Sequence, residues 1–426
     1  MNTLKVHINL PKFALPAYRA FFEEFAWNKG IDLVFAEAEN ALIIGANPKA
    51  DFEISKGFLN QLDHLNFHWK DVFGKESPLV KTEKGKPDLV STALYMLFSG
   101  QEYGRFTADA YGRFPYAKSY QAHFDLVEVN RVQEIFDALA DHEKVKPFVK
   151  VRERENAFFL SHDNDQFHQS WKEDGFWALK KGEIGGLLKI LSKHVQGKPL
   201  WRNMVEIMDL EHQFGRKSTF FWLVENKNTP EGFTNADYEF SSKAVTKLYQ
   251  EIKERGWRNG LHKSLLPKSF SEEMSKFPNP PTTNRNHFLS IQVPETFLEM
   301  EAAGIRLDSS LGFAESHGFR NNYGLPYRVF DFKGNRSLRL IEAPLHIMDA
   351  SQRTYQKRSP EQAEKCLVEF LDKNPKNLNC GLLWHNKFFS DYKFRGWKEV
   401  YKSLLKKGEH WGHFDPDAFL SSRLSE

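Results

Sequence analysis

Short apolar segments alternate with amphipathic segments through most of the chain from about residue 151 onward. Seven of the apolar segments have the composition of buried β-strands, at residues 157–160, 219–224, 257–261, 283–291, 305–308, 338–345 and 378–384. Helical periodicity falls between most of them, most clearly at residues 241–255, 295–303, 360–373 and 396–406. This alternation predicts parallel strands joined by helical crossovers.

Seven β/α units favour a barrel with one unit missing over an open sheet, although periodicity alone leaves the open sheet as an alternative. Two glycines mark expected helix ends. Gly256 and Gly304 follow the helices predicted at residues 241–255 and 295–303, where a left-handed residue often ends a helix. The fold class expected for this part of the chain is therefore α/β, with a distorted (β/α)7 barrel.

The first 150 residues have a different pattern. Short apolar segments at residues 32–35 and 41–44, with helical stretches at residues 18–27 and 88–97, predict a smaller α/β domain. Charged residues dominate residues 143–155, which is typical of a linker. We therefore expect an accessory domain at residues 1–150 and a barrel domain at residues 151–426.

Polar side chains follow several of the predicted strands. Asp163 and Asp165 come after the first strand, and residues two apart on an extended segment point the same way. Their charges would repel each other unless a cation or an arginine lay between them. His262, Asp308 and His385 follow later strands, and catalytic groups of α/β barrels lie at these strand ends. A metal or a catalytic base is indicated, with a solvated turn as the alternative for the aspartates.

A long insertion at residues 167–203 separates the first strand from its helix. It contains Trp171, Phe176, Trp177 and Trp201. Long excursions at this face of a barrel are often lids or binding walls, and an aromatic wall would suit a sugar ring. The alternative is a satellite hydrophobic core.

Composition excludes several classes of protein. The chain has 59 basic and 56 acidic residues, a net charge of +3, and no basic cluster that would follow a phosphate backbone, so no nucleic acid partner is expected. No apolar run is long enough for a membrane span, and no export signal is visible, so a cytoplasmic location is expected. Cys366 and Cys380 are too few for a disulfide framework.

The ordered set of motifs resembles the NodB-homology polysaccharide deacetylases of carbohydrate esterase family 4, in the bacterial branch whose first motif is His-Asp-x-Asp. The motifs span most of residues 151–405. They are Ser161-His162-Asp163-Asn164-Asp165, Gly260-Leu261-His262-Lys263-Ser264, Asn284-Arg285-Asn286-His287, Leu307-Asp308-Ser309-Ser310, Gly318-Phe319-Arg320, Glu342-Ala343-Pro344-Leu345 with Met348-Asp349, and Leu383-Trp384-His385-Asn386. Residues 95–103 and 109–114 also resemble the domain that precedes this catalytic domain in related bacterial proteins.

The resemblance implies a metal-dependent amidohydrolase with a NodB-type barrel. It implies that Asp163 is the general base, that Asp165 and His262 bind a divalent metal, zinc above all, and that His385 is the general acid. Arg285 would orient the base carboxylate.

Three further residues of these motifs are expected to contact the substrate. They are Asp308, Arg320 and Trp384, although Asp308 could instead cap Ser309-Ser310. The substrate implied is a glycan or glycan precursor that contains N-acetylated amino sugar.

This chain departs from the family's common pattern at two of the expected metal ligands. Asn164 separates the two aspartates that are usually adjacent, so the base and ligand roles of Asp163 and Asp165 could be exchanged. The second histidine that usually follows His262 is missing. We expect His287 to replace it, which requires the fourth strand to end near that residue.

Three functions agree with these observations. The first is a deacetylase that removes N-acetyl groups from an amino-sugar-containing glycan. The second is a glycosyltransferase that uses Asp163 and Asp165 to hold a metal against a nucleotide-sugar diphosphate. The third is an inactive barrel that only binds glycan, because the metal site could be incomplete.

Overall fold

Two separate β-sheets organise the chain. The computed structural model describes residues 3–104 and 106–424. The first sheet contains four parallel strands in the order β2-β1-β3-β4, namely β1 (Leu4–Asn9), β2 (Leu33–Phe35), β3 (Leu42–Gly45) and β4 (Phe52–Glu53). The second sheet contains β5 (Ala157–Asn164), β6 (Ser218–Trp222), β7 (Arg258–Lys263), β8 (Thr283–Asn286), β9 (Leu307–Asp308), β10 (Tyr327–Asp331), β11 (Arg336–Glu342), β12 (Leu345–Met348), β13 (Asn379–Leu383) and β14 (Gly412–His413).

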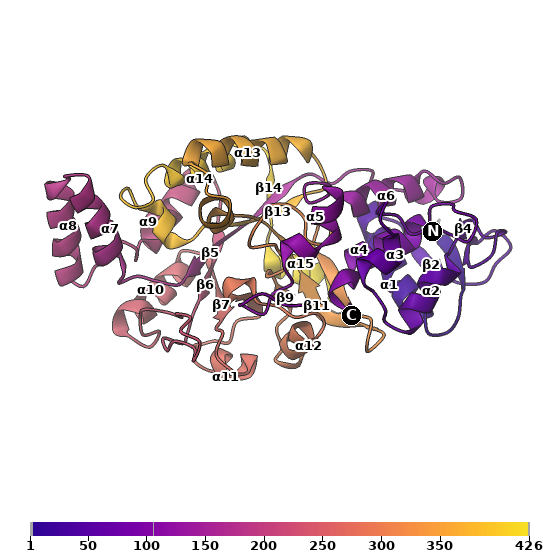
Figure 1. The fold of residues 1–426 in the computed structure, drawn as a ribbon, viewed down its shortest axis with the longest axis horizontal. Helices are drawn as coiled ribbons and strands as arrows, with labels where there is room; N and C mark the ends of the chain where they lie inside the picture. The colour runs from indigo at the N-terminus through magenta and orange to yellow at the C-terminus, as the bar shows by residue number, and fades with distance from the viewer. Residues whose placement is uncertain (1–2, 105, 425–426) are drawn as a thin grey trace.

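Helices cover both sheets (Figure 1). Those of the first part are α1 (Leu15–Lys29), α2 (Lys56–Asp63), α3 (Trp69–Phe73), α4 (Leu89–Leu97), α5 (Tyr120–Phe124) and α6 (Arg131–Ala140). Those of the second part are α7 (Ser170–Lys180), α8 (Ile184–Val195), α9 (Met204–Gln213), α10 (Lys243–Glu254), α11 (Phe270–Met274), α12 (Glu295–Ala302), α13 (Pro360–Lys373), α14 (Trp397–Lys407) and α15 (Pro416–Arg423).

The second sheet is curled. Its strands follow the order β10-β11-β9-β8-β7-β6-β5-β13-β12, and only the β10–β11 pairing is antiparallel among the strands that the structure describes. Strand β11 is second from one end of this order and pairs with β9, and β12 is at the other end and pairs with β13. Only Ala343 and Pro344 separate β11 from β12, so one segment of chain connects the two sides of the sheet. The protein is thus a mixed α/β protein with a sheet curled as in an α/β barrel.

The helical predictions for this region are confirmed, with ends that differ by one or two residues. Helix α13 begins where Pro360 was expected to start it, and a reciprocal capping box between Ser359 and Gln362 satisfies its first turn. Gly256 and Gly304 have φ angles of 83° and 84°, the left-handed conformation expected after α10 and α12.

Several strand predictions were wrong in extent. The segment predicted at residues 283–291 is a strand only to Asn286, and a 3₁₀ turn follows it at His287–Leu289. The segment predicted as one strand at residues 338–345 is divided between β11 and β12, because it must pair with β9 and then with β13. Strand β5 continues to Asn164, because its polar residues pair with β6.

The two sheets share one hydrophobic core. Helix α1 of the first part packs against β10 and β11, and buried residues from Leu4 to Leu405 form a continuous cluster. The first sheet lies at one end of the long axis of the molecule and the α7–α8 pair lies at the other (Figure 1). A division into domains at residue 150 stays a prediction. No helix among the described residues has both the length and the apolar character needed to cross a bilayer.

A buried ion pair joins the first part of the chain to the second. Arg320 donates from Nε and Nη2 to the two carboxylate oxygens of Glu102 at 2.8 and 2.6 Å, and both side chains are 1% exposed or less. Nη1 of the same arginine donates to the carbonyl of Gly312 at 3.1 Å. Both charges are thus fully compensated inside the protein.

We expect Arg320→Ala to lower the free energy of unfolding by about 3–5 kcal/mol, because it leaves the Glu102 carboxylate buried without a partner. Denaturant unfolding would measure this loss. The matched control is Arg336→Ala, which removes an exposed ion pair with Glu301 and should cost less than about 1 kcal/mol. Equal losses in the two variants would contradict this account of the Arg320 contact.

Candidate active site

A cavity of about 400 Å³ lies at the C-terminal ends of the parallel strands of the second sheet. The predicted site residues that line it are Asp163, Asp165, His262, His287 and His385. They come from four different strands or from the residues directly after them. Because the strands are parallel and the sheet is curled, side chains more than 200 residues apart in the sequence meet in one place.

Asp163 lies in β5 and Asp165 directly follows it, and both side chains are almost completely buried. One oxygen of each carboxylate, Oδ1, has no hydrogen-bond partner. Burial would raise the pKa of Asp165, but the histidines around it, His262 above all, hold that pKa well below its usual range. Asp165 is therefore an ionised carboxylate inside the protein, which calls for positive charge nearby.

His262 presents one particular ring nitrogen to these carboxylates. Its Nδ1 lies 2.8 Å from the backbone carbonyl of Arg285, which fixes the proton on Nδ1 and leaves Nε2 directed into the cavity. Nε2 lies 3.3 Å from Oδ1 of Asp165 and 3.5 Å from Oδ2 of Asp163, without a hydrogen-bond partner. Burial alone would lower the pKa of His262, but the two aspartates raise it, so the site favours positive charge at Nε2.

His287 directly follows β8, so the fourth strand ends next to this residue, as its proposed role as a metal ligand required. Its Nδ1 lies 3.4 Å from Oδ1 of Asn235, and its Nε2 lies 3.9 Å from Oδ1 of Asp165. Burial lowers the pKa of His287 to about 3, since the opposing charge of Asp165 is offset by His262 and His385. The imidazole is thus neutral, the form in which histidine binds metals.

Asp165, His262 and His287 form a buried group whose ligand atoms all lie within 4.8 Å of one another. The unpartnered atoms Oδ1 of Asp165 and Nε2 of His262 are the ones that face each other. Buried polar atoms without partners are costly, and a cation between them would satisfy both. One carboxylate and two imidazoles are therefore compatible with a divalent metal.

His385 is held by a carboxylate to which the sequence motifs had assigned no role. Asp349 directly follows β12, and its Oδ1 accepts a hydrogen bond from Nδ1 of His385 at 2.7 Å. Its Oδ2 accepts the backbone N–H of the same histidine at 2.5 Å. Burial would lower the pKa of His385, but Asp349 raises it to about 9. His385 is therefore protonated at neutral pH, with Nε2 3.6 Å from Oδ2 of Asp165.

Arg285 lies behind the cavity and not in it. It is completely buried, donates to the hydroxyls of Ser161 and Ser309 at 3.0 and 2.9 Å, and lies over the ring of Phe221. Its hydrogen bonds do not go to Asp163, although the charge of that carboxylate raises the pKa of the guanidinium against the lowering effect of burial. Arg285 can act on the base only through the electrostatic field.

The three residues expected to contact the substrate do not line this cavity. Asp308 accepts hydrogen bonds from Asn284 and from the backbone N–H of Ser310, which is the capping alternative. Trp384 is buried against aromatic neighbours, and Arg320 is occupied by Glu102. Direct contact of these side chains with a ligand in the cavity would require them to leave buried positions.

Other residues line the cavity that sequence reasoning missed. Tyr111 and Arg113 reach it from the first part of the chain, where Arg113 is paired with Asp109 and donates to the carbonyl of Phe288 at 3.0 Å. Arg353 reaches it from a π-helical turn at Ser351–Tyr355. Residues 1–150, which the sequence predicted to be an accessory domain, therefore contribute side chains to the cavity. The available signal was the motif at residues 109–114.

The insertion at residues 167–203 forms neither an aromatic wall nor a single satellite core. Of its side chains, Glu173 lines the cavity, whereas Trp171, Phe176, Trp177 and Trp201 do not. Trp201 is buried, and its Nε1 donates to Asp174 at 2.9 Å. The remaining three aromatic residues lie on the α7 helix, mostly toward solvent.

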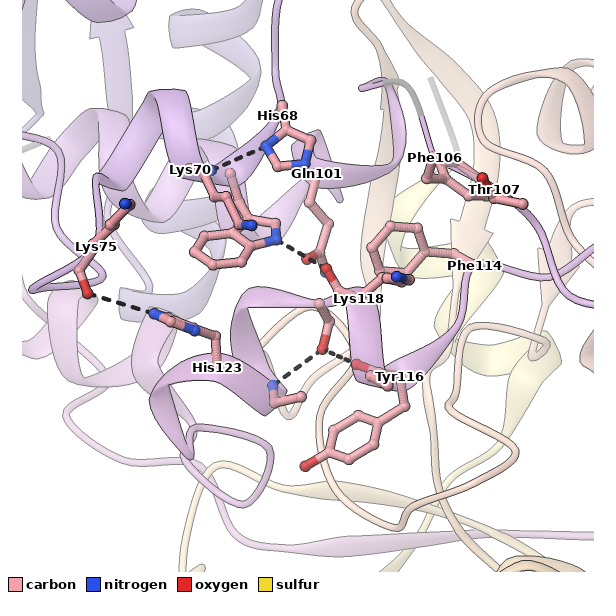
Figure 2. A pocket seen from close by; sticks show the side chains of 14 residues that line it. His68, Lys70, Lys75, Gln101, Phe106, Thr107, Phe114, Tyr116, Lys118 and His123 are labelled. Atoms are coloured by element: carbon pink, nitrogen blue, oxygen red, sulfur yellow. Dashed lines mark hydrogen bonds between the residues drawn. The ribbon is translucent and has the colours of Figure 1, made fainter.

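A larger cavity, of about 910 Å³, lies in the first part of the chain (Figure 2). It is lined by His68, His123 and three lysines among other residues, and by none of the predicted site residues. Its hydrogen bonds join side chains to backbone atoms, as between Nε1 of Trp69 and the carbonyl of Lys118 at 2.8 Å. The larger volume of this cavity therefore does not make it the candidate active site.

A second group of metal-ligating side chains, Glu128, His317 and Cys366, is less suited to a metal. Arg358 donates to Oε1 of Gln352 at 2.6 Å, which fixes the orientation of the Gln352 side-chain amide. The nitrogen of this amide therefore faces Nδ1 of His317 at 3.3 Å and donates to it. The histidine proton is therefore on Nε2, which donates to Glu128 at 3.0 Å. Nε2 of His317, the nitrogen that faces the other two side chains of this group, therefore has no free lone pair with which to bind a metal.

Comparisons with known proteins give little further information. No family model and no curated protein matches this chain. Among solved structures, it is similar to one from Bordetella bronchiseptica described as a "putative polysaccharide deacetylase involved in O-antigen biosynthesis". The two are 13% identical, the similarity covers 59% of this chain and 90% of that chain, and the TM-score is 0.33. A likeness of this size carries no argument, so the proposal below rests on the residues of the site.

Protein purified without chelator or a histidine tag should contain about one divalent metal per chain, and His262→Ala and His287→Ala should each lose it. Plasma mass spectrometry would measure the metal. The matched control is His317→Ala, which removes a histidine of the other group and should leave the content unchanged. Retention of the metal in the His262 variant would contradict the assignment.

Proposed function

We propose that this protein is a metal-dependent deacetylase that hydrolyses N-acetyl groups of an amino-sugar-containing glycan or glycan precursor. The observation that carries the proposal is that a carboxylate, Asp163, and a protonated histidine, His385, lie in one cavity next to a group that can hold a divalent metal. Amide hydrolysis needs a base for the water, an acid for the departing amine and stabilisation of the developing negative charge.

Asp165, His262 and His287 would hold the metal, and we propose zinc as the ion because one carboxylate and two imidazoles leave a tetrahedral site with an open position. When bound, such an ion supplies Lewis-acid chemistry to a carbonyl group and lowers the pKa of water. The proposal assigns Asp165 to the metal and Asp163 to the base, because Asp165 belongs to the group whose ligand atoms lie within 4.8 Å of one another.

Asp163 is suited to accept the proton of the attacking water. Its Oδ1 is buried and has no hydrogen-bond partner, so the oxygen is free to take a proton. The charge of this carboxylate acts on the buried guanidinium of Arg285, whose pKa it raises against the lowering effect of burial. In this proposal Arg285 acts on the base only through its charge and does not touch the substrate.

His385 is suited to protonate the departing amine. Asp349 fixes the orientation of its ring and holds its pKa at about 9, so that Nε2 carries a proton at neutral pH. Nε2 faces the same part of the cavity as Asp165, at 3.6 Å from Oδ2. A proton held there can pass to an amine that leaves from a group bound between His385 and Asp163.

The finer assignments belong to the same proposal. We take the curled sheet to be a (β/α)7 barrel of the NodB-homology type, with the β11–β12 segment serving as one strand of the ring. We take the substrate to be an N-acetylated sugar in a cytoplasmic intermediate of polysaccharide assembly. The order of the motifs in the sequence, and the five predicted side chains that line the cavity at the strand ends, support the barrel assignment.

The zinc-loaded protein should release acetate from N-acetylated hexosamine oligosaccharides, and Asp163→Asn and His385→Ala should each lower kcat by about 10²–10⁴-fold. Both variants should keep their metal, because neither residue is among the three proposed ligands. Enzymatic acetate detection and metal analysis of the same samples would test this.

Two results would favour the alternatives. Release of a nucleotide from nucleotide sugars that depends on Asp163 and Asp165, without acetate release, would indicate a glycosyltransferase. Glycan binding by a protein that takes up no metal would indicate an inactive barrel.

Metal removal by a chelator should abolish acetate release, and zinc should restore it.

Asp349→Asn should lower kcat by about 10²-fold or more and leave KM nearly unchanged. The amide keeps one oxygen for either Nδ1 or the backbone N–H of His385, but it cannot accept from both, so the imidazolium loses its orientation and its compensating charge. A variant with wild-type kcat would contradict the role given to Asp349. Asp372→Asn, which changes an exposed aspartate, is the matched control.

A further inference from the structure

Helices α7 and α8 form a hairpin that projects from the end of the molecule opposite the first sheet (Figure 1). One side of α8 packs on α7: Ile190 is buried, Leu187 lies against Gly175, and the ring of His194 lies 5.3 Å from that of Trp171. The hairpin therefore has a small core of its own. Its outer side is what requires an explanation.

Seven of the nine exposed large apolar side chains among the described residues belong to this hairpin. Four of them are in α8, at spacings of four, three and four residues that place them on one face of the helix. Val195 is 85% exposed, and Leu188 is 62% exposed. The seven residues are Trp171, Phe176, Leu179, Ile184, Leu188, Leu191 and Val195. Concentrated apolar exposure of this kind marks an interaction surface.

The charges of the hairpin are one-sided. Five lysines of the hairpin are exposed, namely Lys172, Lys180, Lys181, Lys189 and Lys193. Each of its three acidic residues is engaged with the body of the protein: Glu173 pairs with Lys393, Glu183 pairs with Arg395, and Asp174 accepts from Trp201 and Ser390. The surface left for a partner is apolar and positively charged.

The hairpin is also fixed next to the candidate active site. Asp174 and Glu173 tie α7 to residues 390–395, and both Glu173 and its partner Lys393 line the cavity. Gly186 of α8 lies against Tyr392 of the same segment, where even a Cβ atom would come within 2.8 Å of the ring. Whatever the hairpin binds is therefore held at a set position relative to the cavity.

We propose that the α7–α8 hairpin binds the surface of a lipid bilayer that contains anionic lipids. The apolar face of α8, with Phe176 and Leu179 of α7, enters the boundary between headgroups and acyl chains, and the lysines contact the lipid phosphates. Apolar faces bordered by lysines are the usual composition of helices that lie in a membrane surface. This inference concerns an attachment surface and does not depend on the proposed deacetylase activity.

Charge distinguishes this partner from a second copy of the chain. Two hairpins that met through the same face would bring their lysines together, and like charges across an interface are unfavourable. An anionic bilayer supplies the opposite charge along the whole length of the hairpin. It also accepts apolar side chains without a complementary groove, whereas a protein partner would need one.

Flotation of the full-length protein with lipid vesicles tests the proposal. The protein should bind vesicles of phosphatidylcholine with phosphatidylglycerol at least about tenfold more tightly than vesicles of phosphatidylcholine alone, and salt should weaken the binding. Leu188→Ser/Val195→Ser and Lys189→Glu/Lys193→Glu should each weaken it by about tenfold or more. Because all four side chains are exposed, unfolding midpoints should stay close to wild type.

Two matched controls change residues of the same kind outside the hairpin. Val34→Ser alters an exposed valine of the first sheet, and Lys84→Glu/Lys86→Glu makes the same change of charge, so both should bind like wild type. The proposal is overturned if the wild type does not bind the anionic vesicles, or if the hairpin variants bind them as well as the controls do. A dimer in sedimentation experiments that only Leu188→Ser/Val195→Ser dissociates would also overturn it and assign this face to a second copy.

Discussion

The burial of two carboxylates at the end of one strand is the constraint on which the candidate site depends. Asp163 and Asp165 are nearly inaccessible to water, and ionised groups in such a place are stable only with positive charge close by. The neighbouring strands bring that charge in three forms: imidazoles that can share a metal, a protonated His385, and the guanidinium of Arg285 behind them. Each of these groups has its own fixed partner. Those partners, the carbonyl of Arg285 for His262 and the carboxylate of Asp349 for His385, decide which ring nitrogen faces the cavity.

The first part of the chain is built into this arrangement. Its helix α1 packs on the antiparallel pair β10 and β11, its Glu102 neutralises the buried Arg320, and its Arg113 reaches the rim of the cavity. A segment that shares the core and supplies cavity residues cannot be removed without exposing apolar surface and a buried charge. This agrees with a role in holding the rim of the candidate site in shape, in addition to whatever its larger cavity does. The hairpin at the other end of the molecule is different, because it contributes little to the common core and leaves its apolar face outward.

The local sequence pattern predicted which helices and strands are present better than it predicted the residues at which they begin and end. Helices α10, α12 and α13 were predictable because their apolar spacing, caps and terminal glycines are local properties of the sequence. Strand ends were less predictable, because pairing decides them: β8 stops at Asn286, and one apolar run is divided into β11 and β12. Arg320, Trp384 and Asp308 were singled out by motif position. Whether a residue lies in a cavity or behind it depends on packing that the motif does not contain.

The sequence by itself determined an α/β chain with polar residues at the ends of apolar strands, and it picked out five of the side chains that meet in the cavity. Those properties follow from periodicity and from the position of charges, which are local. Only the tertiary structure decided that His287 faces Asp165, that Asp349 holds His385, and that Arg113 reaches the cavity from the first part of the chain. It also decided that the insertion presents an apolar and basic face. Each of these depends on contacts between residues far apart in the sequence, and such contacts are fixed by the curl of the sheet and by how the helices pack on it.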